Sequence, residues 1–228
     1  MQDRDTAVDQ LEHRKAHLPE RAELSVVEAR IAEIEAALSD AGARRDVVAQ
    51  RQERLEQETG HVESRIAEIE KRMYSGIVSA SRELQAMAAE VEALKARRSS
   101  LEDDVLAAME EAEPLDEERS GLLAQRAALD ADAERLRAAI AEAEVAIDAD
   151  LAVEREARAA AQADVPVDLL ATYEKLRAKL GGVGAARLVG SSCSGCHLTL
   201  PATELDRIKR ASVDALVFCD QCGRILVH

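Results

Sequence analysis

Apolar residues recur at alternating intervals of three and four along most of the first 163 residues. This 3/4 spacing places them on one narrow stripe of an α-helix, which is the seam of a coiled coil. We therefore predict a mainly α-helical fold in which long helices bury their seams against each other. The first seam keeps one register through Leu24, Val27, Ile31, Ile34, Leu38, Ala41, Arg45, Val48, Gln52, Leu55, Thr59, Val62, Ile66, Ile69 and Met73.

A second seam begins at Leu84 and continues to Ile147. Two prolines interrupt the pattern of the two seams. The register changes at Pro19, which predicts a kink or the start of a helix there. Pro114 lies inside the second seam, and we expect it to bend that helix.

A short segment joins the two seams. Residues 73–84, M-Y-S-G-I-V-S-A-S-R-E-L, contain Gly76, which can end one helix, and serines that can cap the next. We expect the helices to fold back as an antiparallel coiled-coil hairpin over residues 1–164, with the turn near 74–80. Each helix could instead pair with another chain. A hairpin buries its own seam, so we favour a monomer over a coiled-coil dimer.

The charge of the chain limits its partners. The net charge is −15, and the carboxylates lie mostly in the helical part, which should repel nucleic acid and acidic membranes. No apolar run approaches the roughly 20 residues that cross a bilayer. The first residues, M-Q-D-R-D-T-A-V-D-Q, lack the basic and apolar regions of a signal peptide. We expect a cytoplasmic protein with no membrane partner.

The pattern changes after the second seam. Residues 165–182 predict a connecting helix that starts at a proline and ends at Gly181 and Gly182. Residues 183–228 contain short apolar, partly β-branched runs that predict three or four short strands. A domain of this size cannot hold together by core burial alone, so it needs an additional link.

Four cysteines can supply that link. They form two C-x2-C pairs separated by 22 residues, a spacing typical of zinc sites, and four thiolates complete a tetrahedral shell. The first pair belongs to C-S-G-C-H, which could also attach a haem or act as a thiol–disulfide pair, but both alternatives leave the second pair unused. We expect one structural Zn²⁺ bound by Cys193, Cys196, Cys219 and Cys222, with the ribbon domain spanning residues 183–228.

A closed shell of four thiolates leaves no open position for water or substrate. No other group of residues in the sequence suggests catalysis, because the histidines of the helices lie among charged residues and the serines are scattered. We therefore expect that the protein is not an enzyme.

The order of long hairpin, short helix and four-cysteine ribbon resembles a bacterial family of C4-type zinc-ribbon proteins with an N-terminal coiled-coil hairpin. The stretches that carry the resemblance are Y-S-G-I-V-S-A-S-R-E-L at 74–84, L-E-D-D-V-L-A-A-M-E-E at 101–111 and C-D-Q-C-G-R-I-L at 219–226. The resemblance implies zinc on the same four cysteines. Family members are described as nucleic-acid-binding proteins, and some are linked to sigma factors, messenger RNA and flagellar regulation. This set of partners differs within the family and is not transferred.

Our first hypothesis for function is that the ribbon binds RNA or DNA in a regulatory role. Cations approach parity with carboxylates only in this domain, and the candidate contacts are Arg187, Arg207, Lys209, Arg210 and Arg224. Two observations weigh against it. Four thiolates with one Zn²⁺ carry a formal charge of about −2, and Phe218 is the one aromatic residue that could stack on a base. The five cations could equally be ordinary surface residues.

The second hypothesis is a protein–protein adaptor or chaperone. An acidic hairpin offers two large charged faces to basic partner surfaces, for example in the transcription machinery. Polar residues in the seams could let the hairpin flex or open for a partner, or could set the pairing register. These seam positions are Arg45, Gln52, Arg98 and Arg126. The two hypotheses are not exclusive.

Overall fold

The computed structural model describes residues 1–212 and 215–227, so residues 213, 214 and 228 of the expected ribbon lie outside the described part. The elements in this part are α1 (Gln2–Ala16), α2 (Pro19–Tyr74), α3 (Ser81–Ala163), α4 (Val167–Lys179), β1 (Ala185–Val189), β2 (Ser192–Cys193), α5 (Ala202–Arg210) and β3 (Ile225–Val227). They form two compact units, one of residues 24–135 and the other of residues 1–23 and 136–228. We call these the hairpin unit and the ribbon unit.

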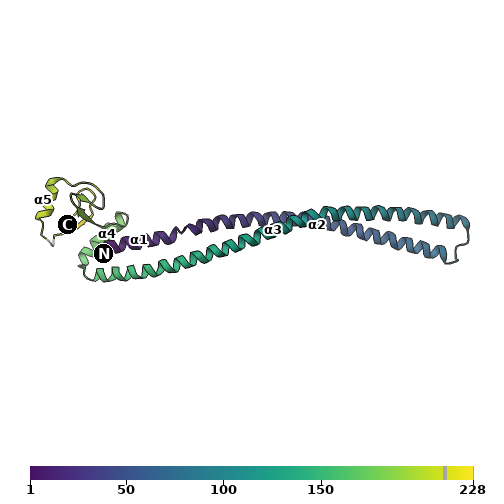
Figure 1. The fold of residues 1–228 in the computed structure, drawn as a ribbon, viewed down its shortest axis with the longest axis horizontal. Helices are drawn as coiled ribbons and strands as arrows, with labels where there is room; N and C mark the ends of the chain where they lie inside the picture. Colours follow the sequence, from purple (N-terminus) through teal and green to yellow (C-terminus); the bar gives the residue numbers. More distant parts are fainter. Residues whose placement is uncertain (213–214, 228) are drawn as a thin grey trace. The chain divides into compact units, whose positions relative to one another are not determined.

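In the hairpin unit, α2 and α3 run antiparallel (Figure 1). Ion pairs connect them along their length: Arg72 with Glu83 near the turn at 3.1 Å, and Arg44 with Glu118 further along at 2.8 Å. At the turn, Gly76 adopts a φ of 74°, a conformation that side chains with a Cβ rarely adopt. The prediction of a mainly α-helical antiparallel hairpin is confirmed.

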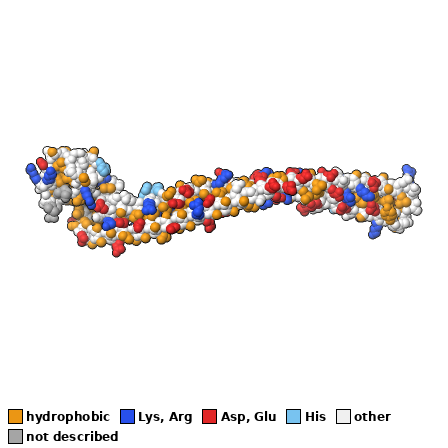
Figure 2. Space-filling view, in the orientation of Figure 1, with side chains coloured by type: hydrophobic (Ala, Val, Ile, Leu, Met, Phe, Trp, Pro, Cys, Tyr) orange, Lys and Arg blue, Asp and Glu red, His pale blue; other side chains and the backbone are white. Residues whose placement is uncertain are grey.

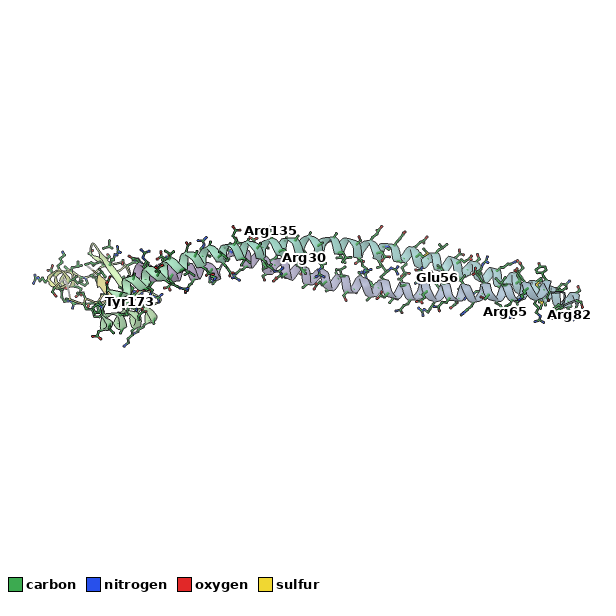
Figure 3. All side chains as sticks on the ribbon, turned by 90° about the horizontal axis from the view of Figure 1, so that it is seen from below. Arg30, Glu56, Arg65, Arg82, Arg135 and Tyr173 are labelled. Carbon is green, nitrogen blue, oxygen red and sulfur yellow. The ribbon has the colours of Figure 1, made fainter. Side chains whose placement is uncertain are left out.

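The seams form the core of the hairpin unit. Near the turn, Ile66 and Ile69 of α2 pack with Met87 and Val91 of α3. In the middle, Val48 packs against two fully or almost fully buried alanines of α3, Ala108 and Ala112. Many charged side chains of these helices are exposed, as Figure 3 shows for Arg30, Arg65 and Arg135.

The prolines have different effects. The expected helix start at Pro19 is confirmed, because α1 ends at Ala16 and α2 begins at Pro19. Pro114 lies inside α3, which continues through it without a break. Pro114 has no backbone N–H to donate, but the apolar seam before and after it packs against α2 and keeps α3 helical.

The ribbon unit contains α1, the C-terminal part of α3, α4 and a small sheet with the strand order β2-β1-β3. β1 pairs antiparallel with β2 and parallel with β3. Gly181 and Gly182 follow α4 with φ values of 68° and 90°, so this glycine pair turns the chain into β1. Within residues 1–212 and 215–227, no helix has both the length and the apolar character that crossing a membrane requires.

Candidate metal centre and its attachment to the helices

The four cysteines converge in the ribbon unit, with all four Sγ atoms within 4.8 Å of one another. The Sγ atoms of Cys193 and Cys222 are 4.0 Å apart, as are those of Cys196 and Cys219. A tetrahedral zinc site with Zn–S bonds of about 2.3 Å separates its sulfurs by about 3.8 Å, so the cluster matches that geometry. The four cysteines form a C4 site for one Zn²⁺.

Tight turns aim the sulfurs at one point. In the first turn, the His197 N–H donates to the Cys193 carbonyl at 2.8 Å, and His197 adopts a φ of 60°. In the second turn, the Gly223 N–H donates to the Cys219 carbonyl at 2.7 Å, and Gly223 has a φ of 72°. Each C-x2-C pair therefore lies in a tight hydrogen-bonded turn. His197 takes part in the first turn through its backbone N–H and its positive φ.

The pKa values of two of the thiols show what a bound Zn²⁺ would change at this site. Burial raises the pKa of Cys219 to about 12 despite opposing backbone hydrogen bonds, so this thiol stays protonated at neutral pH without a metal. Burial also acts to raise the pKa of Cys222, but N–H donation from the Arg224 backbone and side chain lowers it to about 7. Zn²⁺ deprotonates the thiols that coordinate it, which offsets the cost of burying them.

A small apolar core surrounds the sulfurs. Cys193 and Cys219 are buried together with residues from β1, α5 and the segments around them. Too little apolar surface is available here to hold such a domain unaided, so the metal contributes to folding. The other buried members of this core are Ala186, Leu200, Ile208, Val217 and Leu226.

Arg224 faces into the ribbon unit. Its guanidinium donates to the backbone carbonyls of Leu180 and Val183, each at 2.9 Å, and its side chain is half-buried. These carbonyls lie at the end of α4 and just before β1. Arg224 therefore ties the second cysteine pair to the connecting helix, a role that the sequence analysis did not assign to it.

Two more of the five candidate cations are engaged within the chain. Arg187 forms an ion pair with Asp3 of α1 at 2.7 Å. Arg207 contacts Glu204, with Nε to Oε2 at 2.9 Å, and also reaches Asp220 at 3.2 Å. The Arg207 guanidinium lowers the pKa of the Glu204 carboxyl through this hydrogen bond.

Lys209 and Arg210 are different. Both lie exposed in the last turn of α5, and neither has an ion-pair partner among the described residues. Among residues 1–212 and 215–227, two of the five cations therefore have no ion-pair partner, and both lie at the end of α5.

Gln2 of α1 holds the start of β1. Its Oε1 accepts hydrogen bonds from the backbone N–H groups of Gly184 and Ala185 at 2.8 and 3.1 Å. Its Nε2 donates to the Gly182 carbonyl at 3.1 Å. One side chain thus satisfies three backbone groups between α4 and the sheet, which connects the N-terminal helix directly to the ribbon.

Asp5, one turn further along α1, is 1% exposed. Its Oδ2 accepts from the Tyr173 hydroxyl of α4, and its Oδ1 accepts from Arg158 Nε of α3, both at 2.5 Å. A buried carboxylate needs partners of this kind. Nothing in the 3/4 pattern of the sequence indicated this network, because Asp5 is more than 150 residues from both partners.

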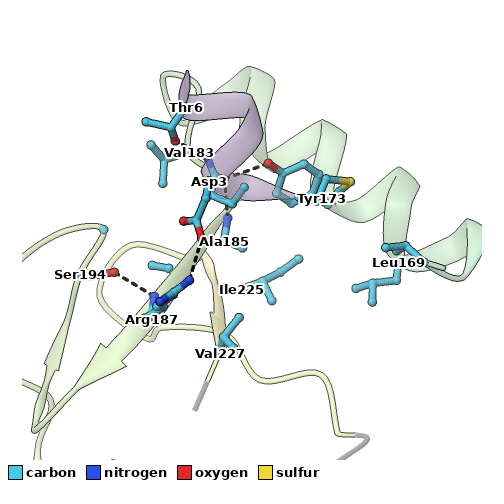
Figure 4. A pocket seen from close by; sticks show the side chains of 15 residues that line it. Asp3, Thr6, Leu169, Tyr173, Val183, Ala185, Arg187, Ser194, Ile225 and Val227 are labelled. Atoms are coloured by element: carbon cyan, nitrogen blue, oxygen red, sulfur yellow. Dashed lines mark hydrogen bonds and ion pairs between the residues drawn. The ribbon is translucent and has the colours of Figure 1, made fainter. Parts of the chain in front are cut away.

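A cavity of about 520 Å³ lies beside this network (Figure 4). Leu169 of α4 and Ile225 and Val227 of β3 supply apolar walls. Arg187 stands at its polar side, where its backbone N–H donates to Ser194 Oγ at 2.8 Å and its guanidinium pairs with Asp3. The cavity therefore belongs to the junction between the helices and the ribbon.

Comparison with known proteins agrees with this architecture. Residues 1–181 match the family described as a CT398-like coiled coil hairpin domain, and residues 192–226 match a C4-type zinc ribbon domain. The chain is 31% identical to the uncharacterized protein Rv2229c of Mycobacterium tuberculosis strain H37Rv, over 98% of this chain and 91% of that protein. It has the same identity and coverage with the uncharacterized protein MT2288 of Mycobacterium tuberculosis strain CDC 1551.

Solved structures share the fold. A Mycobacterium smegmatis protein superposes with a TM-score of 0.89 at 27% identity, covering 99% of this chain and 93% of that one. CT398 of Chlamydia trachomatis gives a TM-score of 0.66 at 20% identity, with 99% and 93% coverage. HP0958 of Helicobacter pylori gives 0.51 at 18% identity, with 99% and 92% coverage. The protein belongs to the family of CT398-like coiled-coil hairpin proteins that carry a C4-type zinc ribbon.

Proposed function

We propose that this protein is a non-enzymatic adaptor whose acidic hairpin binds basic surfaces of other proteins. The observation that carries the proposal is the charge of α3 between residues 102 and 118. This segment contains nine carboxylates and no cation, namely Glu102, Asp103, Asp104, Glu110, Glu111, Glu113, Asp116, Glu117 and Glu118. On the face drawn in Figure 2, acidic side chains gather along the stretch where α2 and α3 run side by side.

Much of this charge is available to a partner. Four of the nine carboxylates form ion pairs with arginines, such as Glu111 with Arg51. The other five have no ion-pair partner within the described residues, and all five are exposed: Asp103, Asp104, Glu110, Glu113 and Glu117. Unpaired carboxylates concentrated on one helix attract and orient basic surfaces.

Two features of the ribbon favour a structural role for it over a catalytic or nucleic-acid-binding one. Its four thiolates fill the coordination shell of zinc and leave no position for a substrate. Arg187, Arg207 and Arg224 are engaged within the chain, which reduces the basic surface available for phosphates. In the adaptor, Gln2 attaches the N-terminal helix to the zinc-bound ribbon, and Asp5 joins the same helix to α3 and α4.

Nucleic-acid binding through the ribbon is the second candidate. The observation that favours it is the exposed pair Lys209 and Arg210 at the end of α5, unpaired among the described residues. Phosphate contacts of this kind would give binding that weakens steeply with salt. Two cations provide less electrostatic attraction than the five expected from the sequence.

In-cell photo-crosslinking tests the proposed function. The full chain would carry a photoreactive amino acid at exposed serines of the hairpin unit, Ser39 or Ser99, or of the ribbon, Ser191 or Ser212. We expect protein adducts from the hairpin positions, to a partner that rebinds the purified full chain less tightly as salt increases. Adducts from the ribbon positions alone, or adducts to nucleic acid, would refute the adaptor.

A further inference from the structure

We propose that a groove between α2 and α3 in the hairpin unit binds an amphipathic helix with basic residues from a partner protein. This inference rests on the proposed adaptor function and names its binding site. Two adjoining cavities form the groove, one of about 430 Å³ and one of about 410 Å³, and Leu106 of α3 lines both. We call it the Leu106 groove.

The groove exists because the seam of α2 is weak here. Gln52 and Thr59 occupy seam positions where leucine or isoleucine would fill the space against α3. Gly60 follows directly and lines the same cavity. A Cβ at Gly60 would meet no atom within 4 Å, so neighbouring atoms do not require glycine there. A helix-interior glycine costs roughly 0.5–1 kcal/mol relative to alanine, and here it leaves the groove open.

The apolar part of the groove comes from α3. Leu106 is 57% exposed and Met109 is 49% exposed, and both line the first cavity. Residues three apart lie on the same side of a helix, so these two side chains form one apolar strip. Single exposed apolar residues are common on protein surfaces. An adjacent pair inside a groove is the arrangement that holds an apolar helix face, and methionine adapts its shape to such partners.

The rim of the groove is acidic. Glu102, Glu110 and Glu113 of α3 line it, and Glu56 and Glu63 line it from α2. One cation, Arg45, also lines it, and its charge is balanced by an ion pair with Asp116 at 3.0 Å. Glu110 and Glu113 have no ion-pair partner among residues 1–212 and 215–227. Charge complementarity therefore selects an occupant with lysine or arginine beside its apolar residues.

The form of the groove selects a helix. The two cavities follow α3 from Glu102 to Asp116, with Leu106 between them. An occupant with apolar residues at i, i+3, i+4 and i+7 would place them along such a line, and lysines on its flanks would reach the rim. Nucleic acid and a second copy of this acidic chain would both meet repulsion here.

A peptide titration against the full chain tests the site. The probe is a fluorescent amphipathic peptide of about 18 leucine and lysine residues with the helical spacing, and the control peptide has the same composition in scrambled order. We expect the probe to bind about tenfold more tightly than the scrambled peptide. The double variant Leu106→Ala/Met109→Ala should lose about tenfold in affinity, and Glu110→Lys/Glu113→Lys should lose a similar amount.

Matched variants distinguish the groove from general effects. Leu123→Ala removes another half-exposed leucine of α3. Asp104→Lys reverses a carboxylate on another side of the same helix that has no ion-pair partner in the described part of the chain. Both should leave the affinity within about twofold of the wild type. The four side chains changed in the groove are exposed, so these variants should fold, and their circular dichroism would check this.

Three results would overturn the inference. The first is equal binding of the amphipathic and scrambled peptides, and the second is unchanged affinity in Leu106→Ala/Met109→Ala. The third is a wild-type dimer that becomes monomeric in that variant, which would assign the groove to a second copy. If the variant still forms the same protein crosslinks from Ser39 or Ser99 in cells, the adaptor function holds and the groove assignment alone fails.

Discussion

Tyr173 of α4 donates its hydroxyl hydrogen to the carboxylate of Asp5 in α1 across 2.5 Å, and both residues are buried. Arg158 of α3 contacts the other oxygen of the same carboxylate. Gln2 Oε1 lies 3.0 Å from the hydroxyl oxygen of Tyr173 and accepts a hydrogen bond from the backbone N–H of Gly184 just before β1. Through these largely buried polar contacts, the first two turns of α1 join α3 and α4 to the start of the ribbon sheet.

Removal of the Tyr173 hydroxyl should destabilise the ribbon unit. Tyr173→Phe keeps the ring but takes one donor from a buried carboxylate, which should cost about 1.5–3 kcal/mol of unfolding free energy. Denaturant unfolding measures this loss. Tyr74→Phe is the matched control, because Tyr74 is 84% exposed and should have almost no effect. Equal stability of the two variants would show that the contact contributes nothing.

The same tyrosine should make stability depend on alkaline pH. Burial, followed by the hydrogen bond to Asp5 and the charge of its carboxylate, raises the pKa of Tyr173 above its ordinary value. In the unfolded chain this group ionises near pH 10. Its contribution is therefore complete below about pH 10 and is lost as pH rises above that value. Unfolding free energies from pH 8 to 11 should fall more steeply for the wild type than for Tyr173→Phe. Parallel curves would contradict the prediction.

Two glycines should respond to alanine in opposite directions. A Cβ at Gly184 would lie 2.8 Å from the Tyr173 carbonyl oxygen and 3.0 Å from its ring. Gly184→Ala should therefore destabilise the protein by about 1–3 kcal/mol. Gly121 lies in α3 with nothing within 4 Å of an added Cβ, so Gly121→Ala should stabilise by about 0.5–1 kcal/mol. Thermal or denaturant unfolding checks both signs, and a stabilising Gly184→Ala would contradict the predicted clash with Tyr173.

Zinc removal should unfold the ribbon and leave the hairpin helical. Purified protein should contain one Zn²⁺ per chain by elemental analysis, and Cys219→Ser should lose it. His197→Ala, a change directly after the first cysteine pair, should retain the metal. With a strong chelator, helical circular dichroism should fall only slightly, because α2 and α3 lie mostly in the hairpin unit and hold no zinc ligand. Loss of most of the helical signal would mean that the hairpin depends on the metal.

The sequence predicted the order of hairpin, connecting helix and ribbon because its two main signals, the seam and the cysteine spacing, are both local patterns. The seam repeats every three or four residues, and the zinc pattern depends on short spacings between cysteines. The sequence therefore identified the leucines and isoleucines of the seams. It did not assign Ala108, Ala112 and Ala133 to a seam, although all three are buried in the structure. Alanine is frequent on both exposed and buried helix faces, so its position alone does not indicate burial.

The attachment of the ribbon could not be predicted in the same way. Gln2, Asp5 and Arg224 are polar residues with no periodic partner, and their contacts join segments far apart in the chain. The sequence placed Arg224 among the candidate phosphate contacts because charge alone does not show which way a side chain points. In the structure it satisfies two backbone carbonyls between α4 and β1.

A paired titration tests most directly whether the hairpin or the ribbon is the binding element. The full chain would be titrated with the amphipathic lysine–leucine peptide and, separately, with labelled single-stranded RNA, from low to high salt. We predict that the peptide binds, with an affinity that falls as salt rises, and that RNA does not bind even at low salt. RNA binding at low salt that is lost in Lys209→Glu/Arg210→Glu, with no binding of the peptide, would contradict the adaptor and assign function to the ribbon.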